Sequence, residues 1–91
     1  MRYVIAYDIS EDSRRNRVAR FLEGWGRRVQ KSVFECDLEP EDLLEVSSRL
    51  REMLDTVEDR CHIYGICGEC VCRRTVIGAA LEPRWEEAVI V

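Results

Sequence analysis

Tyr and Ile stand at every second position near the start of the chain, and this alternation predicts a buried strand from Tyr3 to Ile9. The bulky apolar residues stand at every second position, and Val4, Ala6 and Asp8 fall between them. Successive side chains of a strand point to opposite faces of a sheet. Asp8 is therefore predicted where the strand ends, on the face without the bulky apolar residues.

Apolar residues recur at helical spacing in the next segment. The spacing predicts an amphipathic helix from about Asp12 to Glu23, which Gly24 ends. Ser10 and Asp12 are both suitable N-cap residues, because their side-chain oxygens can accept the first unpaired backbone N–H groups. The apolar face of this helix carries Val18, Phe21 and Leu22.

A second alternating stretch runs from Arg27 to Leu38 and is long for a single strand. We therefore expect a bend or a tight hairpin near Lys31 and Ser32. Pro40 suits the first position of a helix, and the apolar spacing after it predicts a second helix to about Leu54.

The last third of the chain has shorter signals. Residues 60–66 are predicted to form a strand, residues 67–72 a cysteine-bearing turn, and residues 75–78 a short strand. Residues 79–91 form a tail that we expect to add a strand to a neighbouring sheet, that of a second copy. Without a linker or an internal repeat, residues 1–91 are expected to form a single domain.

The order of these elements predicts an α+β fold. Strand, helix, two strands, helix and strand form the ferredoxin-like (βαββαβ) sandwich, here with extra C-terminal strands. Both helices would cover one face of the sheet and leave the other bare. A domain of this size gains stability when a second copy covers such a face, so we expect a homodimer.

Charge is distributed unevenly along the chain, although the net charge is only -4. Residues 14–31 hold seven basic residues and one acid, whereas residues 32–59 hold ten acids and two arginines. Thirteen of the fourteen basic residues are Arg, whose forked guanidinium can grip two phosphate oxygens. The pattern predicts a two-sided molecule with one face suited to a polyanion.

Two further features bear on location. No apolar run approaches the length of about 20 residues that a membrane span needs, so we expect no membrane association. Asp8 also falls where a signal peptide would need its apolar stretch. The sequence thus predicts a cytoplasmic protein.

Asp8 is the candidate for metal chemistry. Mg²⁺ takes oxygen ligands, commonly one or two carboxylates together with waters and substrate phosphates. A twofold axis near the strand end would bring Asp8 of two copies together, and Arg14, Arg15 and Arg17 would then hold phosphate oxygens. The alternative is that Asp8 only precedes a helix and interacts favourably with its dipole.

The five cysteines offer a different kind of site. Cys67, Cys70 and Cys72 have spacing like that of a zinc site, but a structural zinc needs a fourth ligand. Cys61 and His62 would have to supply it, and in a strand they point to opposite faces. We therefore expect no zinc there, although a zinc-dependent interaction module stays open. With His62 as the sole histidine, paired-histidine ribonuclease chemistry within one chain is excluded.

Three stretches together resemble one known family. They are YDIS at residues 7–10 with SRRNRVARFLEGWG at 13–26, RRVQKSVFEC at 27–36, and IYGICGEC at 63–70. Their order and spacing are similar to those of the small Cas-two nuclease family, the second of the universal CRISPR-associated proteins, over roughly residues 1–78. The resemblance implies a ferredoxin-like homodimer, cleavage of RNA or DNA that depends on Mg²⁺ or Mn²⁺, and a place between dimers of the CRISPR integrase during spacer acquisition.

The resemblance also implies roles for individual residues. Asp8 matches the metal ligand and catalytic residue of the family. Tyr7 and Phe34 match aromatic positions that could stack on a base or lie in an interface, whereas Phe34 in an alternating strand is also typical of a core. Arg15 and Arg17 match the helix arginines of the family, Arg28 matches its strand arginine, and Ser32 belongs to the matched SVFE stretch. The full set of expected nucleic-acid-binding residues is Arg14, Arg15, Arg17, Arg28, Lys31 and Ser32.

Two functions follow. The first is a dimeric metal-dependent endonuclease that acts in CRISPR adaptive immunity. The second is a non-catalytic scaffold that binds the nucleic-acid backbone and bridges integrase dimers. The sequence does not decide between them, nor between RNA and duplex DNA.

Overall fold

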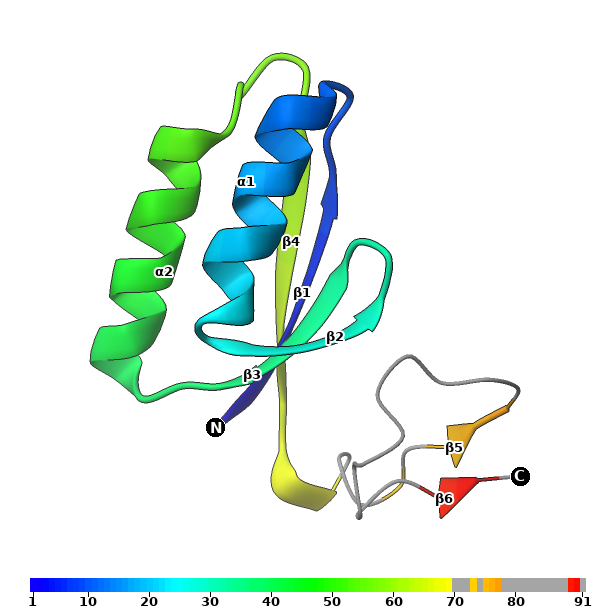
Figure 1. Ribbon diagram of the computed structural model, residues 1–91. Helices are drawn as coiled ribbons and strands as arrows, with labels where there is room; N and C mark the ends of the chain where they lie inside the picture. Colours follow the sequence, from blue (N-terminus) through cyan, green and yellow to red (C-terminus); the bar gives the residue numbers. More distant parts are fainter. Residues whose placement is uncertain (70–72, 74, 78–88, 91) are drawn as a thin grey trace.

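A computed structural model describes residues 1–69, 73, 75–77 and 89–90 of the chain. The elements follow the predicted order of strand, helix, two strands, helix and strand, with two short strands at the end (Figure 1). Their bounds are β1 (Arg2–Asp8), α1 (Asp12–Glu23), β2 (Gly26–Gln30), β3 (Val33–Asp37), α2 (Pro40–Met53), β4 (Arg60–Ile66), β5 (Thr75–Val76) and β6 (Val89–Ile90).

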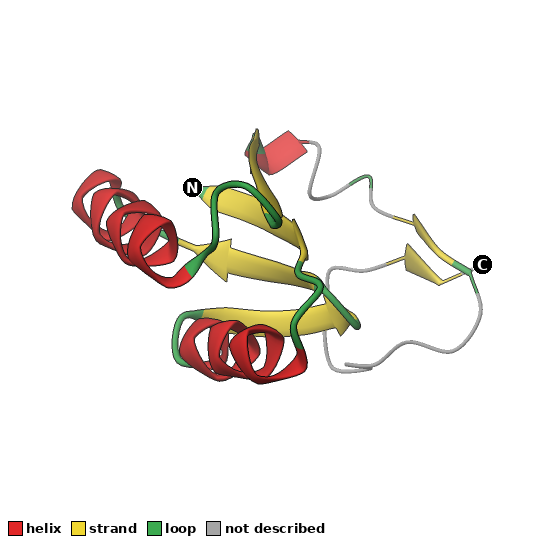
Figure 2. Cartoon of the chain, turned by 90° about the horizontal axis from the view of Figure 1, so that it is seen from above, coloured by secondary structure: helices red, strands yellow, loops and turns green. Residues whose placement is uncertain are grey.

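The first four strands form one antiparallel sheet in the order β2-β3-β1-β4. Both helices lie on one face of this sheet, as Figure 1 shows from the side and Figure 2 from above. This arrangement is the ferredoxin-like sandwich, so the predicted fold class is confirmed. Neither α1 nor α2 covers the opposite face of the sheet.

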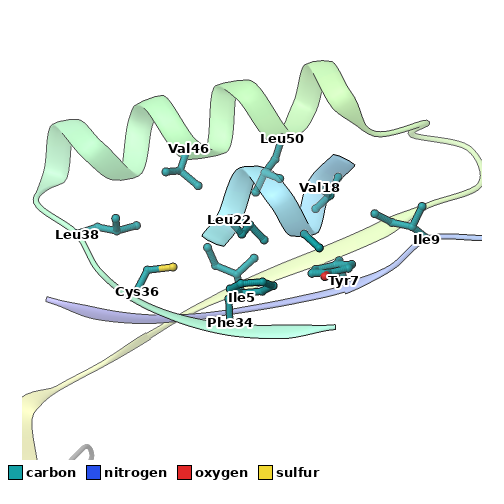
Figure 3. Packing of buried hydrophobic residues seen from close by; sticks show 11 residues of the cluster. Ile5, Tyr7, Ile9, Val18, Leu22, Phe34, Cys36, Leu38, Val46 and Leu50 are labelled. Atoms are coloured by element: carbon teal, nitrogen blue, oxygen red, sulfur yellow. The ribbon is translucent and has the colours of Figure 1, made fainter. Parts of the chain in front are cut away.

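The core lies between the sheet and the two helices (Figure 3). Ile5 and Tyr7 of β1 point toward the helices beside Phe34 of β3, as the alternation of β1 predicts. Each large apolar side chain buried here stabilises the fold by about 1.5–3 kcal/mol. The fully buried side chains from the helices and the following segments are Leu22, Leu38, Val18 and Val46.

The N-cap of α1 is Glu11, so the expectation of Ser10 or Asp12 was wrong by one residue. The Glu11 carboxylate accepts the backbone N–H groups of Ser13 at 3.1 Å and Arg14 at 2.8 Å. Asp12 instead stands in the first turn, where a negative charge interacts favourably with the helix dipole.

The hairpin predicted near Lys31 and Ser32 is confirmed, because these two residues connect β2 and β3. The Arg28 guanidinium donates two hydrogen bonds to the Lys31 carbonyl, from Nε at 3.0 Å and from Nη2 at 2.7 Å. The Tyr7 N–H donates to the Ser32 carbonyl at 3.0 Å. These bonds place the hairpin turn beside the end of β1.

β5 and β6 pair in parallel within the chain and lie apart from the four-stranded sheet, away from the helices (Figure 2). The short strand predicted at residues 75–78 is confirmed for residues 75–76, Ile77 lies outside it, and residue 78 is not among the described residues. Most of the tail, residues 79–88 and 91, lies outside the described residues, so its pairing with a second copy stays a prediction. No described helix is long and apolar enough to cross a bilayer.

Candidate metal and nucleic-acid site

Asp8 is the last residue of β1 and is exposed on the face of the sheet away from the helices. In the register of β1 and β4 it stands directly opposite Arg60. Among the residues that the structure describes, no hydrogen bond or ion pair occupies the Asp8 carboxylate. The carboxylate is therefore available to a ligand from solvent.

The donor set at this position fits a hard cation. A single carboxylate with free oxygens suits Mg²⁺, which keeps several waters and binds substrate phosphates. Within the described ranges, no group of three His, Cys, Asp or Glu residues gathers to form a closed metal site. Cys70 and Cys72, which with Cys67 have spacing like that of a zinc site, lie outside those ranges.

Arg14 is bound inside the chain. Its guanidinium grips the Asp59 carboxylate at two points, with Nε to Oδ2 at 2.6 Å and Nη2 to Oδ1 at 3.1 Å. The Asp59 side chain is 0% exposed. The hydrogen bond raises the pKa of Arg14 and lowers the pKa of Asp59. A phosphate would have to compete with this buried partner for Arg14.

Arg15 and Arg17 lie on the same helix in different surroundings. The Arg15 guanidinium donates to the Ile9 carbonyl at 3.0 Å and also forms an ion pair with Asp12. These contacts hold it just beyond the end of β1. Arg17 is exposed, and no described residue pairs with its guanidinium. Arg17 can therefore bind a phosphate without breaking a hydrogen bond or ion pair with a described residue.

The predicted nucleic-acid-binding residues of the β2–β3 hairpin differ in exposure and in their hydrogen bonds. Arg28 is tied to the Lys31 carbonyl and lies over the Phe34 ring, with its Cζ atom 5.7 Å from the ring centre. This contact is a cation–π interaction. Lys31 is exposed at the turn, and Ser32 is half-buried. Arg28 thus supports the hairpin that presents Lys31.

Tyr7 and Phe34 stack on each other in the core, with ring centres 6.3 Å apart. Phe34 is 0% exposed and Tyr7 is 5% exposed, so neither ring offers a face to a nucleic-acid base in this conformation. The Tyr7 hydroxyl is buried without a hydrogen-bond partner among the described residues. Burial raises the pKa of Tyr7, and the charge of Arg28 partly opposes the rise.

Sequence reasoning did not place Arg60 and His62 near Asp8, although β4 brings both to the same face of the sheet. Arg60 is exposed directly opposite Asp8, and His62 is exposed opposite Ala6. The His62 ring lies 6.0 Å from that of Tyr64. The predicted strand contained both residues, but only the register of the sheet reveals their neighbours.

A cavity of about 390 Å³ lies between α2 and β4. Leu50, Leu54 and Ile63 form part of its apolar lining, and Arg51 and Arg60 also border it. Asp8 does not line this cavity. The candidate metal position is therefore on the open sheet surface and not in the cavity.

The fold and the site define a small ferredoxin-like protein with an exposed carboxylate beside a basic helix, a combination suited to the nucleic-acid backbone. The family model for CRISPR associated protein Cas2 matches residues 1–74. The chain belongs to this Cas2 family.

Individual relatives agree with the family. CRISPR-associated endoribonuclease Cas2 1 of Chloroflexus aurantiacus is 39% identical over 92 residues, which cover 100% of this chain and 99% of the relative. CRISPR-associated endonuclease Cas2 2 of Thermus thermophilus is 43% identical over 67 residues, 74% of each chain. These names support nuclease activity.

Solved structures agree as well. The crystal structure of the hypothetical protein TT1823 from Thermus thermophilus matches with a TM-score of 0.79 and 39% identity, over 87% of this chain and 92% of the other. Streptococcus pyogenes Cas2 at pH 6.5 matches with a TM-score of 0.70 and 29% identity, over 74% of this chain and 87% of the other.

Proposed function

We propose that this chain is a divalent-metal-dependent endonuclease that cleaves RNA or duplex DNA in CRISPR spacer acquisition. The observation that carries the proposal is the Asp8 carboxylate, exposed and without an internal partner at the end of β1. The first turns of α1, with Arg15 and Arg17, follow directly. An anionic metal ligand beside cations is an arrangement that supports metal-dependent phosphodiester cleavage.

Asp8 is the residue that holds the metal, Mg²⁺ or Mn²⁺, in this proposal. When bound, the ion supplies a water of lowered pKa and neutralises charge on the phosphate. Arg17 binds the backbone phosphate, because its guanidinium has no competing partner in the described chain. Arg15 is oriented by the Ile9 carbonyl and adds positive charge at the strand end.

Two copies of the chain make up the working unit in our proposal. One carboxylate per chain is a sparse donor set, and a twofold axis beside the open sheet face would supply the second from Asp8 of another copy. The uncovered face, on which the Tyr64 side chain is 54% exposed, is the surface available for this pairing.

The second candidate is a scaffold that binds duplex backbone and bridges dimers of the CRISPR integrase without cleaving. It is favoured by the same sparse donor set, since one carboxylate per chain is a weak basis for catalysis. Arginine contacts to phosphates serve this function equally well. The two candidates differ only in what Asp8 does.

A cleavage assay with Asp8→Asn separates them. The wild type should cleave single-stranded RNA or duplex DNA in proportion to bound Mg²⁺, and Asp8→Asn should lose at least about 100-fold in rate. Nucleic-acid affinity should stay within about twofold, because the substitution removes a metal ligand and no phosphate contact. Equal rates for the two proteins would refute the endonuclease, and a wild type that binds without cleaving would establish the scaffold.

A further inference from the structure

Arg60 of β4 stands directly opposite Asp8 of β1 in the sheet. Residues directly opposite in an antiparallel pair share a face of the sheet, with their Cβ atoms about 5 Å apart. Arg60 is exposed, and its guanidinium has no hydrogen bond or ion pair with any described residue. A cation and an anion thus lie side by side on one surface, and each is open to an external partner.

The loop before Arg60 fixes its position. The Asp59 N–H donates to the Asp55 carbonyl at 2.8 Å, and the Asp55 N–H donates to the Asp59 carboxylate at 3.0 Å. Asp55 Oδ1 accepts the N–H groups of Val57 at 2.9 Å and Glu58 at 3.2 Å. These closed bonds pre-organise the start of β4, which lowers the entropy cost of binding through Arg60.

Arg14 adds a connection between this loop and α1. Its two-point grip on the buried Asp59 carboxylate ties the first turn of α1 to the residue before Arg60. The grip also neutralises Asp59, so this acid does not compete for Arg60. The pair therefore withdraws one arginine from the surface and steadies another beside Asp8.

We infer that Arg60 binds a phosphate of the nucleic-acid backbone at the Asp8 site, and that Arg14 and Asp59 position it. The inference rests on the proposed function, because it assigns the ligand at Asp8 to a nucleic acid. A guanidinium can hold two oxygens of one phosphate, whereas Asp8 is suited to the metal. Arg60 is then a binding residue of the site, contributed by β4.

The experiment measures nucleic-acid affinity against salt concentration in the Asp8→Asn background, where cleavage does not interfere. Arg60→Gln should weaken binding about tenfold and reduce the salt slope by about one phosphate contact. Arg60→Lys should restore the slope, because the charge returns. The matched control is Arg51→Gln, which removes an exposed arginine from α2 and should change affinity less than twofold.

Kinetics in the presence of Asp8 provide a second readout. Arg60→Gln should raise KM for the nucleic acid more than it lowers kcat, as expected of a contact formed with bound substrate. Equal behaviour of Arg60→Gln and Arg51→Gln, or a lower affinity with an unchanged salt slope, would overturn the inference. Cleavage by Asp8→Asn would refute the proposed endonuclease. The salt dependence of binding would still show whether Arg60 contacts a phosphate.

Discussion

The role of an arginine in this chain depends on the carboxylate that it meets. Arg14 was predicted to bind phosphate because it lies in a basic run, yet its guanidinium is taken by Asp59. Asp59 belongs to the acidic third of the sequence, where no local pattern marks one acid as buried. Asp8 could be predicted, because strand alternation and a following basic helix are both local signals.

The Asp59 pair makes stability depend on pH in the acid range. Arg14 lowers the pKa of Asp59 below its ordinary value of 3.8. A lowered folded-state pKa means that the pair stabilises the fold above the unfolded pKa, and that this contribution is lost as pH falls below about 4. The urea midpoint should therefore fall on acidification from about pH 5 to pH 2. Asp37, paired with Arg2 and 68% exposed, should contribute less.

Asp59→Asn tests whether the Arg14–Asp59 pair causes the acid dependence of stability. It should lower the melting temperature at neutral pH by at least about 4 °C, since the buried guanidinium contact loses its charge partner. It should also flatten the acid dependence of the urea midpoint. An acid dependence as steep as that of the wild type would show that other carboxylates carry it.

Most elements could be predicted from local pattern. The alternation of β1, the bend after Gln30 and the proline at the start of α2 each reflect a short stretch of sequence. The register between β1 and β4 could not, because it depends on how two distant strands align in three dimensions. This register places Arg60 beside Asp8, and so half of the candidate site was invisible in the sequence.

Gly26 lies where the backbones of β2 and β3 approach each other closely. A Cβ atom at this position would lie 2.2 Å from the Glu35 carbonyl oxygen and 2.5 Å from Cys36 Sγ. Gly26→Ala should therefore push the strands apart and cost about 1–3 kcal/mol in the free energy of unfolding, measured by urea denaturation.

Gly24→Ala is the matched control. A Cβ atom there would meet only the Phe21 carbonyl oxygen, at an ordinary 3.5 Å, and the backbone of Gly24 is already helical. Its free energy of unfolding should stay within about 1 kcal/mol of the wild type. Equal losses in the two variants would mean that glycine flexibility, and not the close approach of two strands, explains the effect.

At the scale of the molecule, arginines from two parts of the chain neutralise some of the acids of residues 32–59. Asp59 pairs with Arg14, and Arg2 pairs with both Glu35 and Asp37. Charge counted along the sequence therefore overstates how separate the two faces are. The exposed basic residues that flank the end of β1 in the described chain, Arg17 and Lys31 among them, still favour a polyanion at this end.

The shared use of Asp8 by two copies is the central claim, and a mixed dimer tests it most directly. Wild-type and Asp8→Asn chains with different affinity tags can be co-expressed, and the species that carries both tags isolated. Its Mg²⁺-dependent cleavage rate should fall close to that of the double variant, because one carboxylate is missing from a joint site. A mixed dimer with half the wild-type rate would show that each chain works alone, and would contradict the account.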